Sequence, residues 1–280
     1  MRNKYIYHFL CIIASIIFII PLVLTISNSF MLGGEITANY FRSRANDGEF
    51  LYFRLIPQKF TLEQYVSILL NTPEYLKLFW NSVSYIIPIV IGNIVVSYMT
   101  AYALFRLNSK LADFILILYT VVMLMPYQVI CVPNFMILNS MDLLDTRLAL
   151  ILPAVFNPFG TFLLRQFFTF IPDEYIESSQ ICGANELQIC FYMIFPLIKR
   201  GISALAIITF VEYWNMVEQP LIFLQTSGKE PLSLFLSVMV QDNAGMIFAA
   251  STFYMIPAVL FFLYYKDEFI QGIQLSSGLK

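Results

Sequence analysis

The sequence predicts an all-helical integral membrane protein with about six membrane-spanning helices and both termini in the cytoplasm. Of its 280 residues, 59% are hydrophobic and 12% are charged, and the mean hydropathy is +0.74. Soluble domains contain about 45–50% apolar and about 25% charged residues, and a soluble fold has too little interior to bury so many apolar side chains. The sequence also contains six apolar runs, each near the ~20 residues that span the hydrocarbon core of a bilayer.

The first apolar run begins after two cations, Arg2 and Lys4, as in a secretory signal. It is long, contains Pro21 and is not followed by a small-residue cleavage site, so we interpret it as an uncleaved helix. The expected spans, in order, are His8–Ile26, Phe79–Leu104, Phe114–Leu138, Ala149–Leu164, Ile202–Leu224 and Met246–Tyr265.

Lysine and arginine predict the orientation, because cytoplasmic loops carry an excess of both. With the N-terminus inside, the inner segments hold Arg2, Lys4, Arg106, Lys110, Arg165, Lys199, Arg200, Lys266 and Lys280. Segment 31–78 also holds five cations, but long outer segments translocate largely regardless of charge. The expected organisation is a first helix within 1–30, an extracellular segment 31–78, a five-helix core 79–265 with a cytoplasmic loop 166–200, and a cytoplasmic tail 266–280.

The extracellular segment is expected to be partly helical. Thr61 and Gln64 have the spacing of a capping box, which predicts a helix over 62–70. Thr72 followed by Pro73 is a second helix start. For residues 31–59, a flexible loop and a partly folded segment remain equal alternatives.

The sequence lacks the residues that several classes of function need. The net charge of −2 and the pI near 5.5 leave no basic surface for nucleic acid. With one histidine and no CxxC spacing, a metal site, a catalytic triad or a disulfide is disfavoured, and the four cysteines are interpreted as small hydrophobes. The phosphate-binding pattern GxxxxGK[ST], HExxH and GxSxG are all absent. We therefore expect no catalytic residue and no enzyme activity.

The segment after the fourth run contains the start and stop signals of short helices. Pro172 followed by two acids predicts a helix start, and Gly183 supplies the left-handed residue that ends that helix. Asn185 with Gln188 predicts a capping box for a second short helix, which Pro196 would end. Two short helices joined at a tight turn would form a rigid element that can transmit force.

This segment resembles a known motif. Glu177-Ser-Ser-Gln-Ile-Cys-Gly183-Ala184, followed by Phe195-Pro196, is similar to the "EAA" loop of permease subunits of ATP-binding-cassette (ABC) importers, with serine at 178 and 179 for the family's alanines and Cys182 for its aspartate. The flanks resemble the carbohydrate branch, in particular its maltose-permease-like subunits, from about Phe60 onward. The matching flanks are 60–65, 81–82, 101–106, 148–153, 162–168, 269–272 and 278–280.

The resemblance implies the type I ABC importer permease fold and a division of labour among several chains. A second, homologous permease subunit would complete a heterodimer, a cytoplasmic ATPase dimer would bind ATP and Mg²⁺, and an extracellular or periplasmic sugar-binding protein would deliver substrate. This chain would bind no cofactor and would lie in a bacterial-type cell membrane. Its ATPase-docking residues would be Glu177, Ser178, Ser179, Gly183 and Ala184.

The fifth run carries the candidate substrate path. Glu212 lies ~17 Å along a helix from Gly201, near the middle of a bilayer, and an intramembrane ionisable group is by default a functional candidate. Glu212, Trp214 and Asn215 could hydrogen-bond and stack on a sugar, although neighbours on a helix cannot share one face. The alternative is that Glu212 satisfies a polar group of the partner permease and that Trp214 packs.

Other functions remain as alternatives. An ion-coupled secondary carrier could use Glu212 as its coupling group, but such carriers often show inverted repeats, and none is visible here. An ABC permease for a non-sugar solute, such as a polyol phosphate, has the same sequence features. An intramembrane enzyme lacks paired catalytic groups, and the loop 166–200 could be a plain amphipathic connector.

Overall fold

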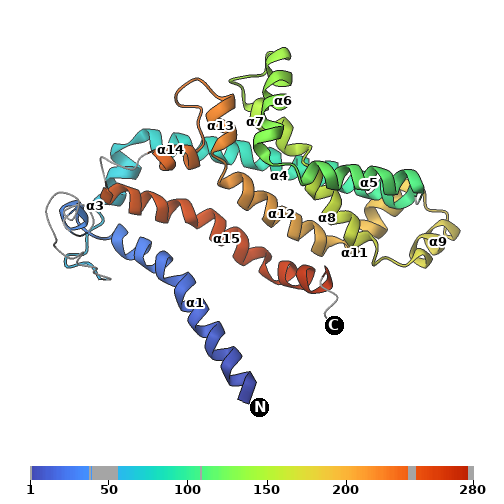
Figure 1. Ribbon diagram of the computed structural model, residues 1–280, viewed down its shortest axis with the longest axis horizontal. Coiled ribbons are helices and arrows are strands. Elements are labelled where there is room, and N and C mark those ends of the chain that lie inside the picture. Colours follow the sequence, from blue (N-terminus) through green and yellow to red (C-terminus); the bar gives the residue numbers. More distant parts are fainter. Residues whose placement is uncertain (1, 38, 40–55, 108, 239–243, 277–280) are drawn as a thin grey trace. The chain divides into compact units, whose positions relative to one another are not determined.

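The computed structural model describes residues 2–37, 39, 56–107, 109–238 and 244–276, and within them every regular element is a helix (Figure 1). The chain divides into two compact units. Unit 1 contains residues 1–79 and 234–257, and unit 2 contains residues 80–233 and 258–280. The all-helical prediction is therefore confirmed for the described residues.

Among the described residues, four helices are long and apolar enough to cross a membrane, and the number rises to six if each of two bent helix pairs forms one span. The four helices are Ile6–Ser29, Pro73–Leu107, Arg147–Phe168 and Gly245–Glu268. The two bent pairs are Lys110–Met123 with Tyr127–Ser140, and Glu186–Leu197 with Lys199–Trp214. The expected number is thus reached only when both bent pairs are included.

Unit 1 contains four whole helical elements from the N-terminal part of the described chain and parts of three helices that continue into unit 2. Its elements are α1 (Arg2–Ser29), α2 (Gly33–Ile36), α3 (Glu63–Val66), the π-helical η3 (Ser67–Asn71), the start of α4 (Pro73–Leu107), most of α14 (Leu232–Val238) and the first part of α15 (Ala244–Ser276). The Ser29 and Tyr65 hydroxyls are 2.7 Å apart, and the Tyr75 hydroxyl donates to the Ala250 carbonyl at 2.8 Å.

The segment before α4 differs from its predicted form in one respect. A helix does cover most of 62–70, and α4 begins at Pro73 as predicted. The capping box is wrong, because the Thr61 hydroxyl accepts from the Glu63 backbone and not from Gln64. Gln64 is buried, and its side chain lies where a Cβ on Gly245 would be. The expected loop at 31–59 falls mostly outside the described residues.

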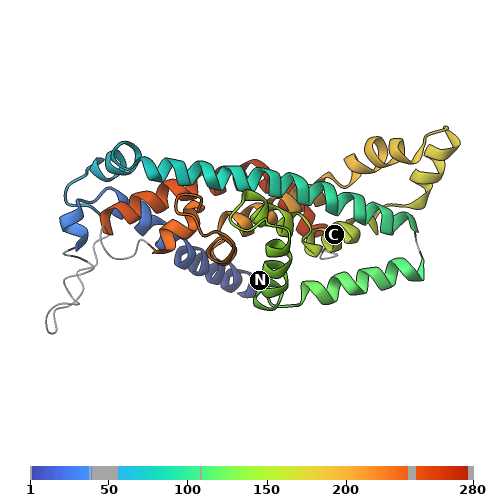
Figure 2. The ribbon, with the colours of Figure 1, turned by 90° about the horizontal axis from the view of Figure 1, so that it is seen from above.

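Unit 2 contains the spans that were predicted as single helices but are broken. The third run forms α5 (Lys110–Met123) and α6 (Tyr127–Ser140), which are bent by 101° (Figure 2). Pro126 explains the break, because proline has no N–H and disfavours helical backbone in the preceding residue. The fourth run forms α7 (Arg147–Val155) and α8 (Pro158–Phe168), which are interrupted only at 156–157 and together make the single candidate span Arg147–Phe168. Between them Asn157 caps α8 by accepting from the Phe159 N–H at 3.0 Å.

The fifth and sixth predicted spans have different ends. Helix α12 (Lys199–Trp214) stops ten residues before the predicted end at Leu224, and a separate short helix, α13 (Glu218–Phe223), follows. At this end the Asn215 side-chain amide donates to the Val211 carbonyl at 2.8 Å, a local contact of the kind that favours helix termini. Helix α15 continues through Ser276, so the predicted tail 266–280 is helical over most of its length.

A buried polar contact joins three of the unit 2 helices. The Asn93 amide of α4 donates to the Ala154 and Val155 carbonyls at 3.3 and 3.2 Å, where α7 ends. Its oxygen accepts from the Thr209 hydroxyl of α12 at 3.3 Å. Beside it, Gly160 of α8 lets the backbone approach so closely that an added Cβ would overlap the Ser97 hydroxyl. This contact fixes the helices that carry the two candidate sites.

Candidate functional site

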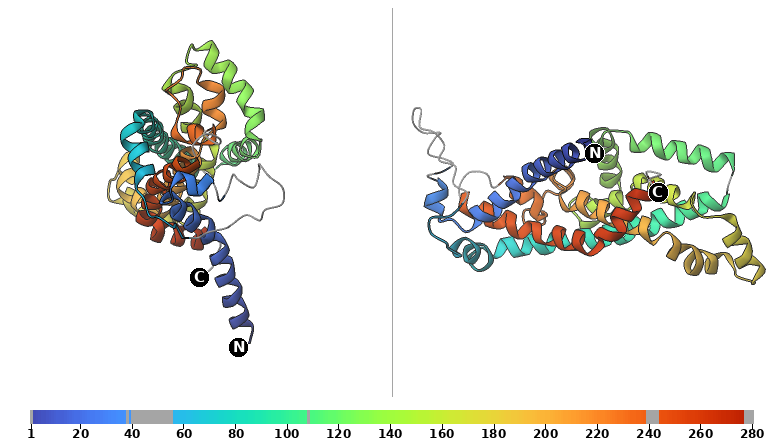
Figure 3. Two further views of the ribbon diagram at one scale, coloured as in Figure 1. Left: turned by 90° about the vertical axis from the view of Figure 1, so that its left-hand side faces the viewer. Right: turned by 90° about the horizontal axis from the view of Figure 1, so that it is seen from below.

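The loop 166–200 forms two short helical segments separated by a tight turn. They are α9 (Asp173–Ile181) and a second segment made of α10 (Glu186–Gln188), the π-helical η4 (Ile189–Ile194) and α11 (Phe195–Leu197). Gly183 has φ +81°, and both bonds of the Asn185–Gln188 capping box are present, at 2.8 and 2.9 Å. These predictions are confirmed, except that the second segment runs one residue past Pro196. Figure 3 (right) shows the loop near one end of α4 within unit 2.

The inner face of the loop is packed into unit 2. Ile176, Ile189 and Ile194 are buried in one cluster with Tyr98 and Phe168. The Tyr98 hydroxyl donates to the Cys190 carbonyl at 2.5 Å. The loop is therefore anchored to α4 and α8 by a continuous apolar core, as a force-transmitting element requires.

The outer face carries the predicted docking residues. Glu177, Ser178 and Gly183 are exposed, and Ser179 and Ala184 are half-buried. Both serine hydroxyls donate to the Tyr175 carbonyl, Ser178 at 3.1 Å and Ser179 at 2.7 Å. Because their hydroxyls bond to their own helix, the two serines present a small surface similar to that of alanine. Ile181, at the end of α9, is 87% exposed.

A charged contact ties the loop to α4, and sequence reasoning missed it. The Arg106 guanidinium donates twice to the Glu186 carboxylate, at 2.5 and 3.1 Å. The Tyr102 hydroxyl donates to the same carboxylate at 2.9 Å, and the Gln180 amide approaches it at 3.5 Å. The spacing of four residues between Tyr102 and Arg106 places both on one helix face, and this spacing is the only part of the contact that the sequence could have indicated. The acceptor of both, Glu186, lies about 80 residues later and has no local sequence signal.

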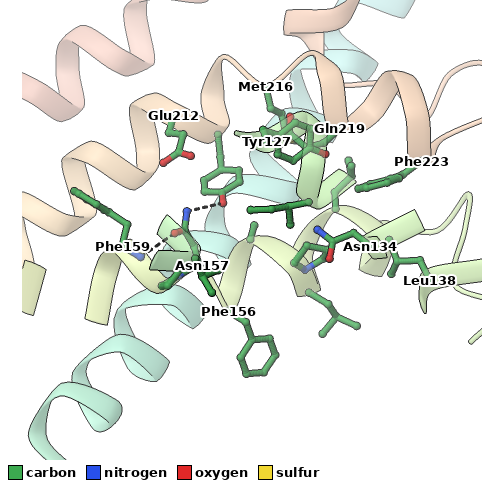
Figure 4. A pocket seen from close by; sticks show the side chains of 18 of the residues that line it. Tyr127, Asn134, Leu138, Phe156, Asn157, Phe159, Glu212, Met216, Gln219 and Phe223 are labelled. Carbon is green, nitrogen blue, oxygen red and sulfur yellow. Dashed lines mark hydrogen bonds between the residues drawn. The ribbon is translucent and has the colours of Figure 1, made fainter. Parts of the chain in front are cut away.

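A cavity of about 740 Å³ lies in unit 2 among α5, α6, α7, α8, α12 and α13 (Figure 4). Glu212 lines this cavity from the last turn of α12. Asn157 lines it from the break between α7 and α8, and its amide donates to the Tyr213 hydroxyl at 3.2 Å. Asn134 and Gln219 add two further amides. Sequence reasoning missed these amides, because Asn157 resembles a helix cap and Asn134 lies inside an apolar run.

The other two residues of the predicted substrate path lie elsewhere. Trp214 is 2% exposed and stacks on Phe210 with ring centroids 5.4 Å apart. The Asn215 amide is directed to the Val211 carbonyl, and neither residue lines the cavity. The shortened α12 also places Glu212 at a helix end and not in the middle of a long span. Within the described ranges, no group of three or more His, Cys, Asp or Glu side chains could hold a metal ion.

A second polar cluster joins two loops that were expected outside the membrane. Asp145, with φ +58°, accepts from the Gln225 and Thr226 backbone N–H groups at 3.0 Å each. Its carboxylate also accepts from the Lys229 ammonium at 2.7 Å. Hydrogen bonds from Lys229 and Thr226 hold the pKa of the Asp145 carboxyl well below its usual value.

Comparison with known proteins identifies a family and several relatives of this chain. Residues 93–266 match the family described as binding-protein-dependent transport system inner membrane component. An arabinooligosaccharide transport system permease protein of Halalkalibacterium halodurans is 28% identical over 227 residues, 80% of this chain and 81% of the relative. An sn-glycerol-3-phosphate transport system permease protein of Pectobacterium atrosepticum is 28% identical over 208 residues, 72% of this chain and 74% of the relative.

The fold has a solved counterpart. A crystal structure of a bacterial ABC transporter involved in the import of the acidic polysaccharide alginate contains a chain that matches with a TM-score of 0.78. The sequence identity is 19%, and the match covers 95% of this chain and 98% of that chain. The family match covers more than half of the sequence and includes the whole loop 166–200. The chain is thus a multi-pass membrane protein that belongs to the family of inner membrane components of binding-protein-dependent transport systems.

Proposed function

We propose that this chain is one permease subunit of an ATP-driven importer for sugars or oligosaccharides. The observation that carries the proposal is the loop 166–200, which combines an inner face locked into the helices with an exposed outer face. A permease without its own phosphate-binding loop needs such an element, because force from a separate ATPase has to enter through a rigid contact. The sugar relatives support the substrate class.

In this proposal a second, homologous permease forms the other half of the path, and a cytoplasmic ATPase dimer holds ATP and Mg²⁺. Closure of the ATPase pair moves α9. The apolar cluster around Ile176 and the Arg106–Glu186 contact pass this motion to α4 and α8. The equilibrium between inward-open and outward-open states is then biased by ATP. Both termini and the loop lie on the cytoplasmic side, and a sugar-binding protein docks on the opposite side.

The proposal is tested with the chain co-expressed and purified with its neighbours, then reconstituted in proteoliposomes. An ATPase subunit and a second permease should co-purify in stoichiometric amounts. With the binding protein outside and ATP inside, labelled arabinotriose should accumulate, and an ATPase variant that binds but does not hydrolyse ATP should abolish accumulation. Accumulation that follows an imposed proton or sodium gradient without ATP would replace the proposal by the ion-coupled carrier.

A further inference from the structure

The cavity of unit 2 has an unusual charge balance for a solute path. Of the residues that line it in the described part of the chain, Glu212 alone is ionisable at neutral pH, and no lysine, arginine or histidine is among them. The carboxylate of Glu212 has no ion-pair partner among the described residues. A solute in the cavity therefore faces a carboxyl group that no cation of the described lining neutralises.

The remaining polar groups of the lining are neutral. Asn134, Asn157 and Gln219 contribute amides that both donate and accept hydrogen bonds. The Tyr127 hydroxyl is buried beside the cavity, so this residue offers its ring and not its hydroxyl to a solute. The three amides match hydroxyl groups of a solute without adding charge.

Aromatic rings complete the lining. Phe156, Phe159 and Phe223 lie around the cavity together with Tyr127 (Figure 4). Their flat apolar faces suit the C–H faces of a sugar ring, whereas a phosphate group needs cations or clustered backbone N–H groups. Of the two solutes in the names of the relatives above, the lining therefore suits arabinooligosaccharides better than sn-glycerol 3-phosphate.

We infer that this cavity admits uncharged polyhydroxylated solutes, such as neutral oligosaccharides, and rejects anionic ones, such as glycerol phosphates or acidic sugars. The inference rests on the proposed function and narrows its substrate class. Glu212 accepts hydrogen bonds from sugar hydroxyls and repels a second negative charge, and the Asn157 and Asn134 amides bind hydroxyls on other sides of the solute. Like charges brought together in a poorly solvated site are strongly disfavoured.

The test compares a neutral probe with an anionic one. The probes are arabinotriose and arabinotrionate, the same trisaccharide with its reducing end oxidised to a carboxylate. ATP-dependent uptake of each is measured in proteoliposomes that contain the whole importer. The wild-type protein should take up the neutral probe at least ~10-fold faster, and Glu212→Gln should reduce that ratio by roughly tenfold. Because the binding protein is identical in both samples, the change in ratio reports the cavity.

Two further variants make the test specific. Glu218→Gln removes a carboxylate that bonds Gln128 and does not line the cavity, and it should leave the ratio unchanged. Glu212→Lys should raise uptake of the anionic probe further, so that failure of one Glu212 variant to fold does not end the test. ATP hydrolysis and melting temperature confirm that each complex is intact.

The outcomes separate the inference from the proposed function. Equal uptake of both probes by the wild type, or an unchanged ratio in both Glu212 variants, would overturn the inference alone. Faster uptake of sn-glycerol 3-phosphate than of arabinotriose, or ATP hydrolysis without uptake of either probe, would overturn both the inference and the proposed sugar substrate. Failure of the proposed function would instead appear as uptake that does not depend on ATP.

Discussion

The turn at Gly183 gives the sharpest test of the loop as a rigid element. Its φ of +81° lies in the left-handed region, and no atom lies within 4 Å of the position of an added Cβ. A substitution there meets no steric neighbour, so its cost is the backbone conformation alone. That cost is roughly 1–2 kcal/mol for an ordinary L-residue, smaller for asparagine and larger for a β-branched residue.

The expected effect follows from this cost. Since ~1.4 kcal/mol is a factor of ten in an equilibrium constant, Gly183→Val should shift the turn away from its native geometry by at least about tenfold. Uptake per ATP hydrolysed should decrease in the order glycine, asparagine, alanine, valine. The assay measures ATP hydrolysis and uptake together in proteoliposomes, with assembly checked by size-exclusion chromatography.

A matched control is available in α2. Gly34 also has open space around an added Cβ but has no positive φ, so Gly34→Ala should leave the ratio of uptake to hydrolysis unchanged. If Gly183→Val assembles with the ATPase and couples uptake to hydrolysis as the wild type does, the turn geometry is not needed and the rigid-loop argument is refuted.

Three further predictions concern other contacts. Gly160→Ala should destabilise the protein by about 1–3 kcal/mol through overpacking, seen as a lower melting temperature in detergent; an unchanged value would contradict the close approach there. Arg106→Glu and Glu186→Arg should each reduce coupled uptake and the pair together should restore part of it, with a coupling energy of only about 0.5–1 kcal/mol because the contact is partly exposed. Asp145→Asn should lower the melting temperature at pH 7. The difference in melting temperature from wild type should shrink as the pH falls below about 4 and vanish below the lowered pKa of Asp145. The reason is that the ionised carboxylate makes the stabilising contacts, and it is protonated below that pKa.

Local signals were sufficient for the elements that depend on neighbouring residues. The start of α4 at Pro73, the left-handed Gly183 and the capping box of Asn185 all follow from contacts within a few residues. Hydropathy predicted the apolar runs but not the bends, because α5 and α6 are both apolar and form one run across Pro126. Pro126 was the available signal for the 101° bend, but Pro21, Pro88 and Pro257 lie inside continuous helices, so a proline alone does not predict a break.

The candidate sites show the same division. Glu212 was recognised because a charge in an apolar run is conspicuous, and the structure places it at the cavity. Trp214 was grouped with it by sequence proximity, although residues two positions apart on a helix point about 200° apart, and it packs on Phe210. The Arg106–Glu186 contact joins residues 80 positions apart, and a single sequence carries no signal for such a pairing.

The most direct test of the central claim is site-specific cross-linking from the tip of the loop. A photoreactive amino acid replaces Ile181, which is 87% exposed, and in a separate protein replaces Leu70, which is 75% exposed in the segment expected outside the cell. In the assembled importer, the probe at 181 should cross-link to the ATPase and the probe at 70 should not. Cross-linking to the ATPase from 70 but not from 181, or from neither, would contradict the account that this loop receives the force of ATP hydrolysis.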